Sequence, residues 1–136
     1  GDEPTVGAEL ARVGLSPDDP RIEIVHAPDV VTMGEPATVA LRTKRYSSIT
    51  VAVSLVRENK ADAVVSAGHT GAAVAASVVK LRTLPGVERP GIATVIPWPE
   101  GAFVLLDAGA NVDAKPLHLV QYALMGEVYA RKILHF

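Results

Sequence analysis

Residues 66–72, with the sequence SAGHTGA, carry the first set of groups that could bind an anion. Gly68 and Gly71 let the backbone approach a ligand closely, and Ser66 and Thr70 add hydroxyl donors. The segment lies between an apolar run and an alanine-rich run, so we expect it to join a strand to a helix. Free N–H groups at a helix start favour phosphate. The alternative is a plain connection with Thr70 as the helix N-cap, because neither common glycine-rich phosphate-binding spacing is present.

Residues 107–116, with the sequence DAGANVDAKP, bring two carboxylates, one amide and one ammonium into a single loop: Asp107, Asn111, Asp113 and Lys115. Lys115 could pair with a phosphate oxygen as a point charge. Asn111 could donate to a carbonyl or phosphoryl oxygen, and Asp107 could orient either side chain. The alternative is that Asp113 caps the following helix while Asp107 and Lys115 form a weak surface pair.

His69 is a candidate general base, because an imidazole titrates close to neutral pH. A lone histidine in a turn is more often a hydrogen-bonding residue, and that alternative stays open. Ser66, His69 and Asp107 could be drawn as a nucleophilic triad, but the strained G-x-S-x-G turn is absent. The chain has no cysteine, and its other histidines lie far apart: His26, His118 and His135. We therefore expect no metal site.

Charge and composition exclude further classes of protein. The chain has 13 Lys and Arg against 15 Asp and Glu, a net charge of −2, so a nucleic-acid partner is not expected. The one basic cluster is Arg42, Lys44 and Arg45, which either meets an acidic protein or is a solvated loop. Trp98, between two prolines, is either an exposed contact at a hairpin tip or a cover for the core edge.

The 136 residues, 49% hydrophobic and 21% charged, are typical of a folded domain with one core. The first ten residues lack the pattern of a secretory signal. The longest uncharged run, 63–79, is interrupted by polar residues and is shorter than the roughly 20 apolar residues of a membrane span. We expect a soluble chain, and the absence of cysteine fits a reducing compartment. Both ends look cut from a longer protein.

Periodicity predicts the elements that hold these loops. Residues 21–27 alternate apolar and polar side chains and predict a strand, as does the apolar run 61–66. Residues 49–59 favour a helix that begins after an N-cap at Ser47 or Ser48, and residues 71–81 favour another. Residues 33–45 read as a short helix or an irregular segment.

The second half of the chain predicts a hairpin of strands 91–96 and 102–106. It then predicts a helix from Pro116 to near Leu134 with one apolar stripe: Leu117, Val120, Leu124 and Val128. Strands alternating with helices favour an α/β sandwich with a mainly parallel sheet and a hairpin. We expect residues 1–136 to be one domain, or part of one.

Three long motifs, ADAVVSAGHTGA, LRTLPGVERPGIATVIP and VLLDAGANVDAKPLHLVQYALMGEVYA, closely resemble the phosphate acyltransferases of bacterial phospholipid synthesis. The resemblance covers nearly the whole chain. It implies an enzyme without cofactor that moves a fatty acyl group from acyl carrier protein to inorganic phosphate. It also implies a homodimer with a three-layer α/β fold similar to isocitrate dehydrogenase and phosphotransacetylase. The enzyme would be cytoplasmic or peripheral at the membrane, where a glycerol-3-phosphate acyltransferase uses the acyl phosphate.

The resemblance also implies roles for the two loops. The first loop matches the family's strand-to-helix motif and implies contacts with phosphate or substrate: Ser66, Gly68, His69, Thr70 and Gly71. In the second loop Asp113 would bind substrate, and the catalytic positions would be Asp107, Asn111 and Lys115. The family most often has Asn at position 69. Its members are more than twice as long and have a strand and loop before this segment and a second half after it.

Two other functions remain open at this point. A phosphate acetyl- or butyryltransferase on a related fold would act on coenzyme A thioesters and need a nucleotide-binding surface. A non-catalytic module would bind phosphate or carrier protein without cleaving a thioester.

Overall fold

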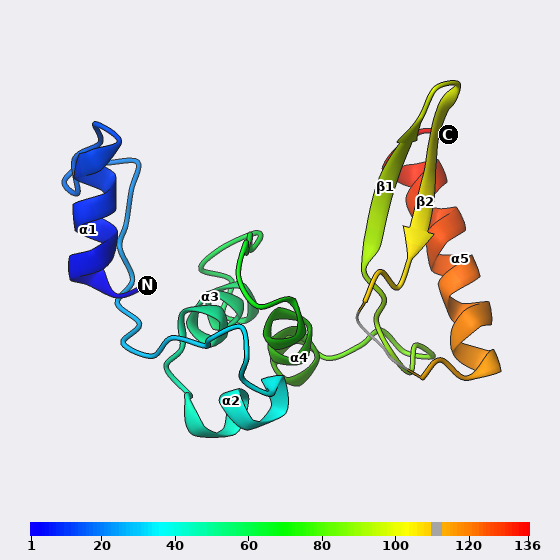
Figure 1. Ribbon diagram of the computed structural model, residues 1–136, viewed down its shortest axis with the longest axis horizontal. Coiled ribbons are helices and arrows are strands. Elements are labelled where there is room, and N and C mark those ends of the chain that lie inside the picture. The colour runs from blue at the N-terminus through cyan, green and yellow to red at the C-terminus, as the bar shows by residue number, and fades with distance from the viewer. Residues whose placement is uncertain (110–112) are drawn as a thin grey trace. The chain divides into compact units, whose positions relative to one another are not determined.

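The computed structural model describes residues 1–109 and 113–136, which form two compact units, 1–82 and 83–136 (Figure 1). Unit 1 contains four helices: α1 Glu3–Arg12, α2 Ala37–Thr43, α3 Ser48–Arg57 and α4 Thr70–Leu81. Unit 2 contains a hairpin and a helix: β1 Ala93–Trp98, β2 Gly101–Leu106 and α5 Pro116–Lys132. The expectation of a single domain stays a prediction.

The core of unit 1 lies where α4 packs against α2 and α3. The buried side chains there are small, chiefly Ala40, Val53, Ala72 and Ala76, so the helix backbones approach closely. Ser47 is the N-cap of α3, as predicted, and its hydroxyl accepts a hydrogen bond from the Thr50 N–H at 3.4 Å. The predicted helices 49–59 and 71–81 are confirmed as α3 and α4.

The N-terminal helix α1 was not expected from the sequence. Asp2 is its N-cap and accepts a hydrogen bond from the Thr5 N–H at 3.2 Å, and Pro4 lies in its first turn. Both are recognised helix-start signals. None of the residues of α1 is buried. The periodic apolar pattern that indicates a packed helix therefore did not predict it.

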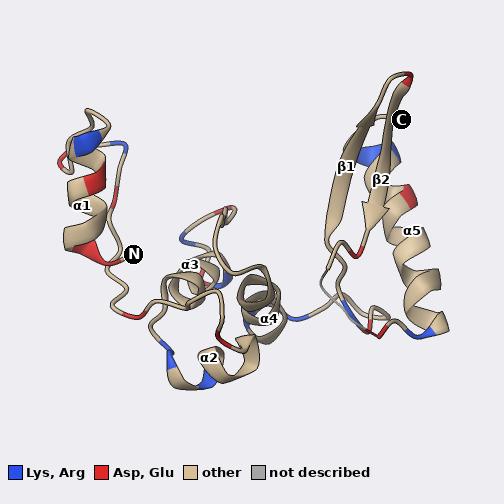
Figure 2. Ribbon diagram, viewed as in Figure 1, with Lys and Arg blue, Asp and Glu red and all other residues tan. Residues whose placement is uncertain are grey.

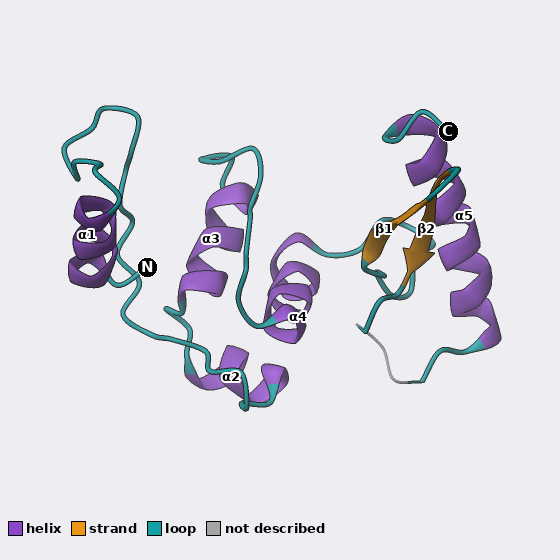
Figure 3. Ribbon diagram, turned by 45° about the horizontal axis from the view of Figure 1, so that its top comes forward, coloured by secondary structure: helices purple, strands orange, loops and turns teal. Residues whose placement is uncertain are grey.

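The predicted strands 21–27 and 61–66 are wrong, because both segments are loops in the structure (Figure 3). Alternating side chains indicate half-burial, but a strand also needs a neighbouring backbone for its hydrogen bonds. Residues 21–27 lie beside no second strand among the described residues: the Ile22 N–H donates to the nearby Asp19 carbonyl at 2.8 Å, and the terminal N of Gly1 donates to the Val25 carbonyl at 3.0 Å. The Gly1 carbonyl in turn accepts from the Ala27 N–H at 2.8 Å. In the second segment, Val65 is 96% exposed.

The predicted hairpin of unit 2 is confirmed. Strands β1 and β2 pair antiparallel from Ala93 opposite Leu106 to Trp98 opposite Gly101. Helix α5 packs against β2, and Gly126 permits the close approach, since a Cβ there would lie 3.0 Å from Leu106 Cδ1. The described residues therefore form an α/β structure whose sheet is a two-stranded antiparallel one. The larger, mainly parallel three-layer sandwich stays a prediction.

Helix α5 presents its apolar stripe to solvent. Leu117, Val120, Leu124 and Val128 are each 51–60% exposed, whereas His118 and Tyr122 are buried. Between Lys115 and Glu127 the helix has no Lys, Arg, Asp or Glu (Figure 2). A helix long and apolar enough to cross a membrane does not occur among the described residues.

Candidate substrate-binding loops

The loop before α4 contains the first group of candidate residues. The Ser66 hydroxyl accepts a hydrogen bond from the Gly68 N–H at 3.3 Å, which closes a small turn. Ser66, Gly68 and Thr70 are exposed, while His69 and Gly71 are half-buried. The loop and the start of the helix therefore present their polar groups to solvent on a backbone held by local hydrogen bonds.

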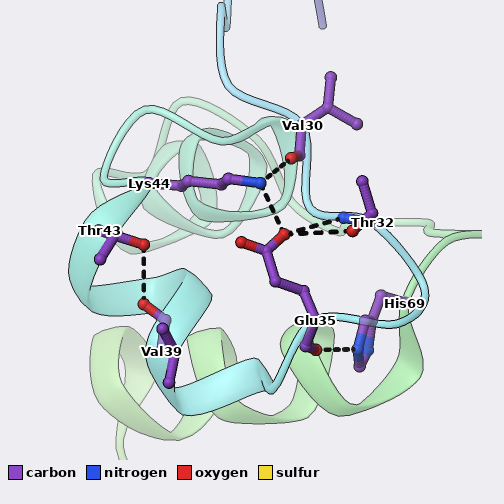
Figure 4. A network of polar contacts seen from close by, with 7 residues as sticks. All are labelled: Val30, Thr32, Glu35, Val39, Thr43, Lys44 and His69. Carbon is purple, nitrogen blue, oxygen red and sulfur yellow. Dashed lines mark hydrogen bonds and ion pairs between the residues drawn. The ribbon is translucent and has the colours of Figure 1, made fainter.

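His69 is the N-cap of α4, which corrects the alternative that Thr70 has this position. Its Nδ1 atom accepts from the Ala72 N–H at 3.2 Å, and its Nε2 atom lies 2.9 Å from the Glu35 carbonyl oxygen (Figure 4). Because a carbonyl only accepts, Nε2 has the proton and donates it. Both ring nitrogens are therefore engaged by the backbone. The predicted contact of His69 with phosphate stays a prediction.

The Glu35 side chain holds the loop before α2, whose Glu35 carbonyl accepts the hydrogen bond from His69. Its Oε2 atom lies 2.6 Å from Lys44 Nζ and accepts from the Thr32 N–H at 3.2 Å (Figure 4). These hydrogen bonds, first from Lys44 and then from Thr32, hold the pKa of Glu35 below its usual value. Lys44 also donates to the Val30 carbonyl at 2.7 Å. Lys44, one of the three residues of the basic cluster, thus forms its contacts within the chain. Binding of the cluster to an acidic protein stays a prediction.

Two backbone donors remain at the start of α4. The Ala72 N–H is taken by His69 Nδ1 and the Ala73 N–H by the His69 carbonyl at 3.0 Å. The N–H groups of Thr70 and Gly71 have no acceptor among the described residues. The first turn of the helix has no acidic side chain. This arrangement can bind an anion, because helix dipole and N–H groups act in the same direction.

A cavity of about 240 Å³ lies in unit 1 next to Ser66, with α3 and α4 contributing to its lining. Its walls are mostly apolar, with Ile49 and Val53 among them, and the described residues that line it bring no charged side chain. Phosphate therefore meets no charged side chain inside it. The donors suited to an anion lie at the helix start.

The second loop begins at Asp107, directly after β2. The Asp107 N–H donates to the Ile92 carbonyl at 2.9 Å, and the backbone turns sharply there, with φ of 66° at Asp107 and 84° at Gly109. A positive φ is uncommon outside glycine, although Asp and Asn adopt it more often than other residues. Candidate position Asn111 lies outside the described residues.

The Asp107 carboxylate is hydrogen-bonded to Tyr122 of α5. Tyr122 is buried, and that burial, followed by the charge of Asp107, raises the pKa of its phenol, while Arg89 acts in the opposite direction. Helix α5 therefore positions the carboxylate that begins the loop. Sequence reasoning missed Tyr122 because it belongs to a helix face that the apolar stripe did not indicate.

Lys115 is the N-cap of α5, which corrects the alternative that Asp113 caps this helix. The physical reason lies within the first turn, where the Lys115 N–H donates to His118 Nδ1 at 3.1 Å. Asp113 and Lys115 are both exposed. Neither takes part in an ion pair formed by the described residues, so the Lys115 ammonium is open to an anionic ligand.

Sequence reasoning also missed the residues that join α5 to the preceding loop. His118 Nε2 lies 3.1 Å from Glu88 Oε2, and Gln121 Nε2 donates to the Gly86 carbonyl at 2.7 Å. The partners are 30 and 35 residues apart in the chain, so no local pattern indicates them. Within the described parts of the chain, no three metal-ligating side chains come together.

Comparison with known proteins identifies the family of this chain. A family model described as "Fatty acid synthesis protein" matches residues 1–136, and the chain belongs to this family. The chain is 52% identical over 133 residues to "Phosphate acyltransferase" of Pelotomaculum thermopropionicum. It is 53% identical over 133 residues to the protein of the same name from Akkermansia muciniphila. In both comparisons 98% of this chain aligns, and it spans 38% of the relative.

Proposed function

We propose that this chain is part of a phosphate acyltransferase that moves a fatty acyl group from acyl carrier protein to inorganic phosphate. The observation that carries the proposal is the identity of about half of all aligned residues with proteins of that name. The start of α4 supports it, because the Thr70 and Gly71 N–H groups suit a phosphate oxygen. The exposed Lys115 ammonium supports it in unit 2.

The proposed reaction needs no covalent acyl-enzyme. A phosphate oxygen attacks the thioester carbonyl, the C–O bond forms, and the C–S bond breaks to release the carrier-protein thiol after protonation of its sulfur. Catalysis then depends on holding phosphate in line with the carbonyl and on donors that meet the developing oxyanion. These are tasks for backbone N–H groups and a fixed cation rather than for a nucleophilic side chain.

The roles follow the chemistry of each loop. We assign phosphate contacts to the first loop, at Ser66, Gly68, Thr70 and Gly71, with His69 holding the helix start. We assign substrate orientation and charge balance to the second loop, at Asp107, Asn111, Asp113 and Lys115. The whole protein would act as a cytoplasmic homodimer, peripheral at the membrane, and pass acyl phosphate to a glycerol-3-phosphate acyltransferase.

The experiment that tests the proposal is an amide NMR titration of the 136-residue chain with inorganic phosphate and then with a long-chain acyl phosphate. Sodium chloride at equal ionic strength is the control. Shifts confined to residues 66–72 and 107–115 support the assigned contacts. A folded spectrum with no shifts at millimolar phosphate contradicts them.

Turnover requires a separate assay, in which phosphate-dependent release of carrier-protein thiol is measured from an acyl carrier protein substrate. Thiol release that depends on phosphate supports the acyltransferase. Phosphate binding without thiol release supports the alternative of a non-catalytic binding module.

A further inference from the structure

Among the described residues of unit 2, His118 is the most deeply buried polar one, with 1% of its surface exposed. It lies in the first turn of α5, three residues after Lys115. Its Nδ1 atom accepts from the Lys115 N–H at 3.1 Å, and its Nε2 atom lies 3.1 Å from Glu88 Oε2. Because Nδ1 is an acceptor, the ring proton is on Nε2 and is donated to Glu88. A buried ring with both nitrogens engaged keeps one orientation.

The contact with Lys115 is one half of a capping box. In that motif a side chain three residues into the helix, usually Glu or Gln, accepts from the backbone N–H of the N-cap residue. Here an imidazole takes that position. Pro116 follows Lys115 and restricts its backbone to extended geometry, and Lys115 has φ −78° and ψ 159°. The Lys115 backbone is therefore restrained at its N–H and by the next residue.

The far side of the imidazole is also fixed. Glu88 is held by its own backbone, since its N–H donates to Gln121 Oε1 at 3.1 Å. The Gln121 amide group in turn donates to the Gly86 carbonyl at 2.7 Å. The loop before β1 is thus joined to the first turns of α5 at three points. This arrangement stabilises Glu88 at the position where it accepts from His118.

We propose that His118 is a positioning residue that holds Lys115 for contact with the anionic substrate, and that Glu88 fixes the imidazole in the required orientation. The inference rests on the proposed function, which gives Lys115 its role. A side chain whose backbone is already ordered loses less conformational entropy when it binds. His118 therefore acts on the ligand through Lys115 and does not touch it.

Three variants of the 136-residue chain separate positioning from packing. His118→Leu fills the buried position with an apolar side chain and removes the acceptor, whereas His118→Gln supplies an acceptor of the kind usual in a capping box. Glu88→Ala leaves the acceptor but frees the ring, and Glu88 is exposed enough for the fold to tolerate it. Glu100→Ala, in the hairpin turn of the same unit, is the matched control for loss of an acidic side chain.

The first measurement is the order of the Lys115 N–H by ¹⁵N relaxation, together with its protection from hydrogen exchange. We expect His118→Leu to lose order and protection, His118→Gln to retain them, and Glu88→Ala to lie between. Equal order in the parent and all three variants would overturn the proposal. If His118→Leu does not fold, the order of the Lys115 N–H is compared between Glu88→Ala and Glu100→Ala. Lower order in Glu88→Ala alone supports the proposal, and equal order in the two overturns it.

The second measurement is the dissociation constant for inorganic phosphate, followed at the Lys115 amide. We expect His118→Leu to raise it by about three- to tenfold, and His118→Gln to stay within about twofold of the parent. An unchanged constant with a disordered Lys115 would refute positioning for the ligand. If the parent shows no phosphate shifts at all, the proposed function loses its phosphate site, and the relaxation data alone decide whether His118 positions Lys115.

Discussion

The imidazole of His69 connects two segments that are 34 residues apart, because its Nε2 atom donates to the Glu35 carbonyl at 2.9 Å. The same ring caps α4 through Nδ1. His69 therefore sets the start of α4 from two directions, along the helix and across to the loop before α2.

Substitution of His69 separates these two contacts. His69→Ala removes both, and we expect it to lower the free energy of unfolding by about 1–2 kcal/mol. His69→Asn keeps a good N-cap and loses the contact with Glu35, so we expect it to cost about 1 kcal/mol or less. Urea unfolding of both variants measures the difference. Equal losses would show that the cap contributes nothing.

A negative charge at Gly71 is expected to weaken phosphate binding. Gly71→Asp places a carboxylate beside the two open N–H groups, and we expect about a tenfold or greater loss of affinity. Gly71→Asn is the matched control, since it has the same size without the charge. A Cβ at this position would lie 3.2 Å from His69 Cε1, so both variants displace the ring similarly. Calorimetry that finds the two equal would remove the anion site from the start of α4.

Acid is expected to destabilise unit 1 through Glu35. Hydrogen bonds from Lys44 and Thr32 lower the pKa of this carboxyl in the folded state. A lowered folded pKa adds stability above the unfolded pKa, and that stability is lost as pH falls through the folded value. We expect the melting temperature of the parent to fall more steeply below pH 4.5 than that of Glu35→Gln. Lys44→Met should reduce the dependence of the melting temperature on pH in the same way. Parallel curves of melting temperature against pH in the parent and both variants would exclude this ion pair as the cause.

Alkali is expected to destabilise unit 2 through Tyr122. Burial, and then the charge of Asp107, raises the pKa of this phenol above its usual value. The folded state therefore keeps a proton that the unfolded state releases, and stability falls as pH rises past the unfolded value. We expect circular dichroism melts between pH 9 and 11 to show a smaller decline for Tyr122→Phe than for the parent. Tyr46→Phe, at a tyrosine that is 68% exposed, should decline like the parent.

Sequence patterns predicted the elements whose stability is local. The Ser47 cap, the alanine-rich run of α4 and the hairpin around Pro99 and Glu100 each depend on residues a few positions apart. Strands 21–27 and 61–66 failed because pairing depends on a backbone elsewhere in the chain. Helix α1 was missed because its signals are in its cap rather than in a buried face.

The candidate loops were located from glycine, hydroxyl and charged residues, and each lies before a helix as predicted, α4 and α5, although residues 61–66 are a loop and not the expected strand. The way they are held was not predictable. His69 meets Glu35, and His118 meets Glu88, across 34 and 30 residues. Such contacts arise only after the helices have packed, so local spacing holds no trace of them.

We expect the solvent-exposed apolar stripe of α5 to promote association of this chain in concentrated solution. Leu117, Val120 and Leu124 lie in the uncharged part of the helix before Glu127, and they form an apolar strip that buries little area while it faces water. Light scattering should therefore rise with protein concentration before any unfolding is seen. A single charge in the apolar stripe, as in Val120→Glu, should improve solubility. It should leave the melting temperature of unit 2 nearly unchanged, because Val120 is exposed.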